Sequence, residues 1–209
     1  MQTESRIVFP VVASATQALF KMERVSAFID GENFLYGVKS INKYYTDFNF
    51  DFKRYINYLT KGRKLISIYY IIAPLKQNIT PILYTKQQKL LSRLRKEGIN
   101  VLLCKRTKRE NSDGTPCHKI KEDDIRLALQ MQKDAYDNKF DIALLFSGDG
   151  DFVPLPEYLK EKGKKMELVY FEGQTAFTLL RVCNFKASTI NKKILNKFFY
   201  REPQKLNKK

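Results

Sequence analysis

From Val25 onward, short apolar segments alternate with segments whose apolar residues recur at helical spacing. The apolar, strand-like segments are 25–30, 64–73, 99–105, 141–147 and 165–171, and the helical ones are 51–61, 82–98, 123–138, 152–163 and 175–183. In segment 51–61, for example, Phe52, Tyr55, Ile56 and Leu59 share one helical face. Strand–helix alternation of this kind forms a parallel sheet covered by helices on both faces. The sequence therefore predicts a three-layer, Rossmann-like α/β fold with a central, mostly parallel sheet of about five strands.

Two segments do not follow the alternation. Residues 105–121 are highly charged and contain Asp113-Gly114, a turn signal, which predicts a loop or a hairpin. Residues 191–209 are basic with some aromatic residues, and we expect a helix that frays into disorder. A chain of 209 residues suits one α/β domain. We expect an N-terminal extension over 1–21, one domain over 22–190 and a basic C-terminal tail over 191–209.

The charge of the chain favours a polyanionic partner. Lys and Arg number 38 against 22 Asp and Glu, which gives a formal net charge of +16. Clustered Lys and Arg most often neutralise phosphates, although charge alone does not separate RNA from DNA. The candidate nucleic-acid contacts are Ser147 and the basic residues Lys105, Arg106, Lys108, Arg109 and Lys121.

The composition also bears on the cellular compartment. Cys104, Cys117 and Cys183 are too few and too widely spaced for a disulfide framework, and His118 is the only histidine. No apolar stretch approaches the roughly 20 residues of a membrane span. The apolar run near Pro10 is a poor secretory signal, because that proline interrupts it. We expect a cytoplasmic protein that does not associate with membranes.

Four aspartates lie where chemistry is expected in such a fold. Asp30 ends the first predicted strand, Asp149 and Asp151 follow the fourth, and Asp124 begins the third predicted helix. In an open parallel sheet, functional residues collect at the carboxyl ends of the strands. Several carboxylates without histidine or cysteine are the ligands of a hard cation. The sequence therefore predicts a Mg²⁺ or Mn²⁺ site, where bound ions would activate a water and stabilise the charge that develops on a phosphodiester.

Other residues around these acids fit the same chemistry. Gly148 and Gly150 let the backbone turn tightly and bring its amides close to a phosphate. Asn33 lies three residues after Asp30 and could orient the phosphate or a water through its amide.

Each of these residues also has a purely structural interpretation. Asp30 and Asn33 could form an Asx turn, and residues 147–151 could be a solvated loop. Asp124 and its neighbour Asp123 could simply cap a helix. The joint occurrence of the acids at the predicted strand ends favours the metal site.

Three motifs together resemble the NYN domain, in the LabA-like branch of the PIN-like nuclease fold. They are FIDGENF at 28–34, KEDDI at 121–125 and FSGDGDFVPL at 146–155. The resemblance covers about residues 24–190, and the first and last motifs are specific as a pair. It implies a metal-dependent ribonuclease with a parallel sheet and an acidic cluster that holds Mg²⁺ or Mn²⁺.

The family's functional residues correspond to particular positions of this chain. The resemblance implies that Asp30, Asp124, Asp149 and Asp151 bind metal and that Asn33 is catalytic. It also implies hydrolysis that leaves a 5′-phosphate and a 3′-hydroxyl. Gln130 stands near a position where many members carry a further acid, so a second metal ion is in question.

Three functions remain open from the sequence. The leading hypothesis is a Mg²⁺- or Mn²⁺-dependent endoribonuclease that acts on single-stranded or flexible RNA. The second is an RNA-binding regulatory protein with a weak or inactive acidic site. A phosphatase that forms a phospho-aspartate is disfavoured, because such enzymes carry an aspartate two residues after the first one, where this chain has Glu32.

Overall fold

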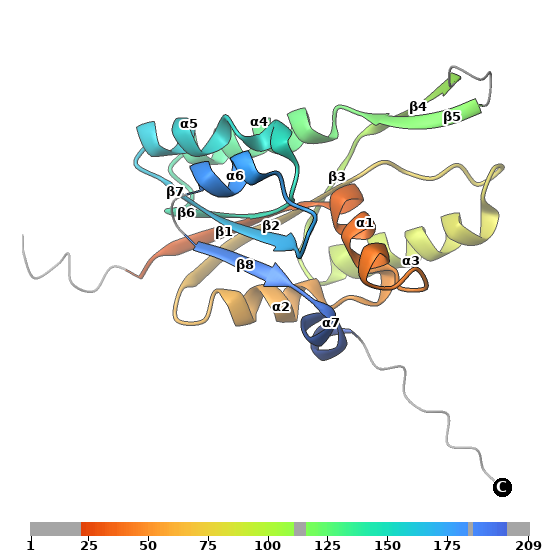
Figure 1. Cartoon of the computed structure of the whole chain (residues 1–209), viewed down its shortest axis with the longest axis horizontal. Coiled ribbons are helices and arrows are strands. Elements are labelled where there is room, and N and C mark those ends of the chain that lie inside the picture. Colours follow the sequence, from red (N-terminus) through yellow and green to blue (C-terminus); the bar gives the residue numbers. More distant parts are fainter. Residues whose placement is uncertain (1–21, 111–115, 184–185, 200–209) are drawn as a thin grey trace, which may run out of the picture.

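The core of the computed structural model is a six-stranded sheet in which all neighbouring strands are parallel (Figure 1). The structure describes residues 22–110, 116–183 and 186–199. The strand order is β3-β2-β1-β6-β7-β8. The strands are β1 (Arg24–Asp30), β2 (Lys64–Ile72), β3 (Asn100–Leu103), β6 (Ile142–Phe146), β7 (Lys165–Phe171) and β8 (Lys186–Ile190). This confirms the predicted three-layer α/β fold, with one strand more than expected.

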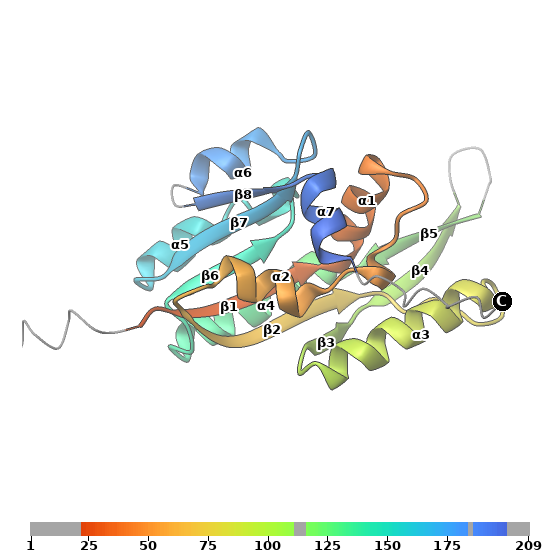
Figure 2. The ribbon, with the colours of Figure 1, turned by 90° about the horizontal axis from the view of Figure 1, so that it is seen from below.

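The helices form a layer on each face of the sheet (Figure 2). One layer contains α1 (Gly31–Ile41), α2 (Phe52–Leu59), α3 (Pro81–Lys96) and α7 (Lys192–Phe198); the other contains α4 (Asp123–Tyr136), α5 (Leu155–Glu161) and α6 (Phe177–Val182). Each layer buries its own hydrophobic core against the sheet, the first rich in phenylalanine and tyrosine. Among the described residues, no helix is long and apolar enough to cross a membrane.

Helix α1 and strand β8 were not among the elements predicted from the sequence. Helix α1 begins at Gly31, directly after β1, so no loop residues separate the two elements. Because no turn residues mark the boundary, the change from strand to helix periodicity is difficult to detect in the sequence. Strand β8 has the sequence KASTI with two exposed residues at its start, so it lacks the apolar run by which the other strands were recognised.

Helix α1 lies close to the sheet because Gly37 has no side chain. A Cβ at Gly37 would lie 2.0 Å from Cδ2 of Phe171 in β7. The Phe171 ring in turn packs edge-on against Phe34 of α1, with ring centroids 5.2 Å apart. This packing holds the N-terminal half of α1, and hence Asp30 just before it, in a fixed position relative to β7.

The described residues of the charged segment 105–121, for which a loop or a hairpin was predicted, form two paired strands. Strands β4 (Lys105–Glu110) and β5 (Pro116–Lys121) pair antiparallel in a two-stranded sheet of their own. The ribbon projects from the body of the molecule in Figure 1. Its predicted turn at Asp113-Gly114 lies outside the described residues.

The first part of the predicted basic tail belongs to the folded domain. Helix α7 begins at Lys192, and its Asn191 N-cap side chain accepts a hydrogen bond from the Ile194 N–H at 3.1 Å. Leu195 and Phe198 are buried in the core on the α2 side of the sheet. Residues 200–209, like the predicted extension 1–21, lie outside the described residues.

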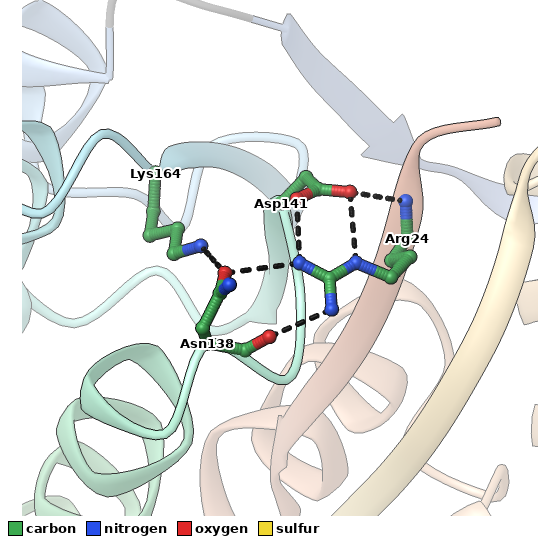
Figure 3. Close-up of polar contacts among 4 residues, drawn as sticks. All are labelled: Arg24, Asn138, Asp141 and Lys164. Carbon is green, nitrogen blue, oxygen red and sulfur yellow. Dashed lines mark hydrogen bonds and ion pairs between the residues drawn. The ribbon is translucent and has the colours of Figure 1, made fainter. Parts of the chain in front are cut away.

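A polar network at the start of β1 fastens this strand to the loop between α4 and β6 (Figure 3). The Arg24 guanidinium donates to both carboxylate oxygens of Asp141, at 2.8 and 3.1 Å. It also donates to the backbone oxygen of Asn138 at 2.7 Å and to its side-chain oxygen, which accepts from Lys164 as well. This network lies at the amino end of β1, whereas Asp30 lies at its carboxyl end.

Candidate active site

Asp30 is the buried centre of the candidate site. As the N-cap of α1 it accepts a hydrogen bond from the Asn33 N–H at Oδ1, at 3.0 Å, and its Oδ2 accepts one from the Ser147 hydroxyl at 3.0 Å. The residue is only 3% exposed. Burial raises the pKa of Asp30 to about 7. The nearby negative charge of Asp124 also raises this pKa, whereas the two hydrogen bonds lower it. A carboxylate held in this way is stabilised when positive charge comes to lie beside it.

Asn33 and Ser147 tie together the carboxyl ends of β1 and β6. The Asn33 side-chain oxygen accepts the Gly148 N–H at 3.0 Å. The Ser147 hydroxyl, besides donating to Asp30, accepts the Asp149 N–H at 3.1 Å. Ser147 is 2% exposed, so its position suits orienting Asp30; a contact with nucleic acid stays a prediction.

Asp149 and Asp151 have different surroundings. Oδ1 of Asp149 accepts the Asp151 N–H at 3.0 Å and so caps the short 3₁₀ helix η3 (Gly150–Phe152). The Asp151 side chain is exposed. The capping role therefore belongs to Asp149, and the Asp151 carboxylate stays available to a ligand.

Asp124 and Asp151 line the same open cavity. The cavity has a volume of about 450 Å³ and is lined by Asp123, Asp124, Asp151 and Phe152, among others. Burial raises the pKa of Asp124 to about 6, and the negative charges of Asp123, Asp149 and Asp151 contribute further. The N-cap of α4 is Glu122, whose side chain makes no capping bond. The structure thus brings the predicted acids into one electrostatic neighbourhood.

The donor chemistry of this neighbourhood fits a hard cation, since every candidate ligand is a carboxylate oxygen. Among the described residues, however, no three His, Cys, Asp or Glu side chains lie close enough together to hold one ion. Like-charged carboxylates repel one another unless a cation lies between them or a proton neutralises one. The raised pKa values of Asp30 and Asp124 reflect this mutual repulsion together with burial.

The predicted basic contacts lie on the hairpin that joins β3 to α4. Lys105 pairs with Lys121 at the base of the ribbon, immediately before the acids that begin α4. The Lys105 side chain is 75% exposed and lies 3.7 Å from the Glu122 carboxylate. The backbones of Arg106, Lys108 and Arg109 belong to β4.

Segment 174–176, which was not predicted to belong to the site, lies along the acidic turn. The Ala176 N–H donates to the Gly148 backbone oxygen at 2.9 Å. A Cβ on Gly148 would lie 2.1 Å from the Gln174 backbone oxygen. These contacts involve backbone atoms of ordinary loop residues, so no residue type in the sequence signals them.

Comparison with known proteins places the chain in a family. No curated protein matches it. A crystal structure of a protein of unknown function from Vibrio parahaemolyticus RIMD 2210633 is similar in fold, with a TM-score of 0.63 and 22% sequence identity over 87% of this chain and 98% of that one. The family model of the NYN domain matches residues 24–191. The match includes every acid of the candidate site, and the chain therefore belongs to the NYN domain family of PIN-like nucleases.

Proposed function

We propose that this protein is a Mg²⁺- or Mn²⁺-dependent endoribonuclease that cleaves single-stranded or flexible RNA. The observation that carries the proposal is the position of Asp30. Its carboxylate is buried, held by two donors and destabilised by Asp124, at the carboxyl end of a central strand. Burying an ionisable carboxylate with no cationic partner is costly, and binding a divalent cation offsets that cost. We also propose that the domain belongs to the LabA-like branch of the family.

The residues of the site have separate roles in this proposal. Asp30, Asp124, Asp149 and Asp151 would hold the ion, which when bound supplies Lewis acidity for the attack of water on a phosphodiester. Ser147 and the Asn33 N–H fix the direction of the Asp30 oxygens. The Asn33 side chain fixes the Gly148–Asp151 turn against α1. The open cavity beside Asp124 and Asp151 gives the phosphate access.

Cleavage of a labelled single-stranded RNA by the purified protein tests this function. We expect products to appear with Mn²⁺ or Mg²⁺ and to disappear with EDTA, and we expect Asp149→Asn to be inactive. Products that carry a 5′-phosphate support hydrolysis of the proposed type. If cleavage persists in EDTA and in Asp149→Asn, it does not depend on a metal ion at the acidic site, and the proposal is contradicted.

Asp151 gives a sharper prediction, since its carboxylate is exposed and does not cap η3. We expect Asp151→Ser to raise the Mn²⁺ concentration for half-maximal rate by about 10- to 100-fold, the cost of losing a ligand or its support. Because the substitution is at the surface, the free energy of unfolding should change by no more than about 0.5 kcal/mol. A titration of rate against Mn²⁺, with thermal melting in parallel, measures both. An unchanged Mn²⁺ requirement excludes Asp151 from the metal site.

A second function, RNA binding without cleavage, is favoured by one observation. No three carboxylates are already gathered for metal binding among the described residues, and Gln130 provides no further acid. The Gln130 amide instead donates to the buried Asp134 at 2.9 Å, a structural contact within α4. A protein of this kind would retain RNA with unchanged length at any Mn²⁺ concentration.

A further inference from the structure

A second depression lies in the other helical layer, between α3 and the short helix η2 (Asp47–Asn49). Its volume is about 390 Å³. Thr46, Phe48 and Asn49 line one side, and Lys86, Lys89 and Arg93 line the other. We call it the η2–α3 groove. Lys86, Lys89 and Arg93 recur at spacings of three and four residues, so α3 presents one continuous basic edge to the groove.

Arg93 builds the wall of the groove. Its guanidinium donates to the backbone oxygens of Phe48 at 2.7 Å and Phe50 at 2.9 Å, and lies 3.6 Å from the Glu97 carboxylate. These contacts fasten the η2 segment to α3. The charge of Arg93 is therefore largely used within the protein.

Lys86 and Lys89 are different. Both side chains are exposed, and within the described part of the chain neither ammonium group makes an ion pair or a hydrogen bond. Some lysines elsewhere on the molecule are paired, for example Lys139 with Asp134 at 2.8 Å and Lys165 with Glu23 at 3.1 Å. The groove thus carries two uncompensated positive charges beside polar backbone and an aromatic residue.

A chain of buried contacts connects the groove to the candidate active site. Asp47 of η2 is 1% exposed, and its carboxylate accepts a hydrogen bond from the Tyr70 hydroxyl at 2.6 Å. The ring of Tyr70 lies against Gly31, where a Cβ would be only 2.8 Å from it. Gly31 directly follows Asp30. These contacts hold the groove in a fixed relation to the acidic site.

We propose that the η2–α3 groove binds the phosphate backbone of single-stranded RNA several nucleotides away from the scissile bond. This inference rests on the proposed ribonuclease function and adds a substrate-length requirement to it. A positively charged groove that also contains an aromatic side chain is the usual means of binding a single strand without reading its sequence. Phe48, which lines the groove and is partly exposed, supplies the aromatic.

The test compares two double variants that each remove two exposed lysines. Lys86→Gln with Lys89→Gln neutralises the groove. Lys160→Gln with Lys186→Gln is the matched control, since Lys186 begins β8 and Lys160 lies beside the start of β7, at the opposite edge of the sheet. Affinity for fluorescent single-stranded RNAs of 4 and 16 nucleotides is measured by anisotropy in EDTA, where the proposed cleavage does not occur. These lengths match the range of about 4–16 nucleotides that one OB-fold domain occupies on a single strand.

We expect the groove variant to bind the 16-mer at least about 10-fold more weakly than the wild type and to bind the 4-mer equally. The salt slope for the 16-mer should shrink by about 0.7 for each lysine that contacts a phosphate. The control variant should behave like the wild type. If both variants lose the same affinity for the 16-mer, or if the salt slope of the groove variant is unchanged, the groove does not bind RNA. If groove-dependent binding occurs but Mn²⁺ brings no cleavage, the groove stands and the proposed nuclease function fails.

Discussion

The Asp30→Asn variant is expected to lose RNA cleavage and to melt at a higher temperature than the wild type in EDTA. Loss of this carboxylate should reduce the rate by at least about 100-fold, because it removes the only deeply buried acid of the proposed metal site. The asparagine oxygen can still accept the Asn33 N–H, and the amide NH₂ that replaces Oδ2 can donate to the Ser147 hydroxyl oxygen. Activity and stability should therefore change in opposite directions.

The pH dependence of this stability difference follows from the raised pKa of Asp30. A carboxyl group whose folded-state pKa lies above its unfolded value favours folding below the unfolded pKa, and that contribution is lost as the pH rises through the folded pKa. For Asp30 the unfolded-state pKa is 3.8 and the folded-state pKa is about 7. At pH 8 the ionised form should destabilise the wild type by on the order of 4 kcal/mol, while at pH 5 most of the molecules keep the proton. Thermal melting in EDTA at both pH values should show a large advantage of Asp30→Asn at pH 8 and a small one at pH 5.

Asp141→Asn is the matched control, since it also removes one carboxylate at the end of a central strand. Asp141 directly precedes the amino end of β6. Here the carboxylate is paired with Arg24 and lies at the amino edge of the sheet (Figure 3). The variant should keep the wild-type rate and melt at a lower temperature, because a hydrogen bond to a charged group typically contributes about 1.5–3 kcal/mol. If Asp30→Asn also melts lower than the wild type at pH 8, the account of a buried, uncompensated charge is wrong. If it cleaves RNA at the wild-type rate, Asp30 is not part of the active site.

The fold was largely predictable because its central strands are buried and therefore apolar. Segments such as 141–147 have that pattern without interruption, and the corresponding β6 is buried at every position. The pattern fails at the periphery, where a strand has only one neighbour. β8 contains two exposed residues, and the first four residues of β2 alternate between exposed and partly buried because β3 pairs only from Tyr69 onward. Local composition cannot identify a strand that is held mainly by its partner's backbone.

The candidate acids were predictable for a different reason. Asp30 and Asp149 follow apolar runs, and the topology of a parallel sheet brings such ends together. The sequence could not show the depth of each acid, which depends on packing. Asp30 is buried beneath α1 and Ser147, whereas Asp151 is exposed, although both carboxylates lie at the same edge. The sequence also could not show which acid caps the helix, because that depends on the path of the backbone. In the structure Asp149 caps η3.

The two glycines of the acidic turn are expected to differ sharply when each is replaced by alanine. In Gly148→Ala the new Cβ would lie 2.1 Å from the Gln174 backbone oxygen and 3.1 Å from the Thr175 Cα. These are backbone atoms, so the turn and segment 174–176 must move apart. That movement disturbs the hydrogen bonds that Gly148 makes with Asn33 and Ala176. We expect a loss of about 1–3 kcal/mol of stability and, because a displacement of about 1 Å can cost 100-fold in rate, a decrease in cleavage on that order.

Gly150→Ala is the matched control within the same turn. Its Cβ would meet only the Cβ of Ala176, at 3.3 Å, a contact that a few tenths of an ångström of movement relieves. Less freedom in the unfolded chain offsets part of that cost, so the free energy of unfolding should stay within about 1 kcal/mol of the wild type. The cleavage rate should also stay close to the wild-type value. Urea unfolding and single-turnover cleavage of the two variants measure both effects. Equal behaviour of the two variants would mean that segment 174–176 does not hold the acids in place, and that the turn is positioned from the Asn33 side alone.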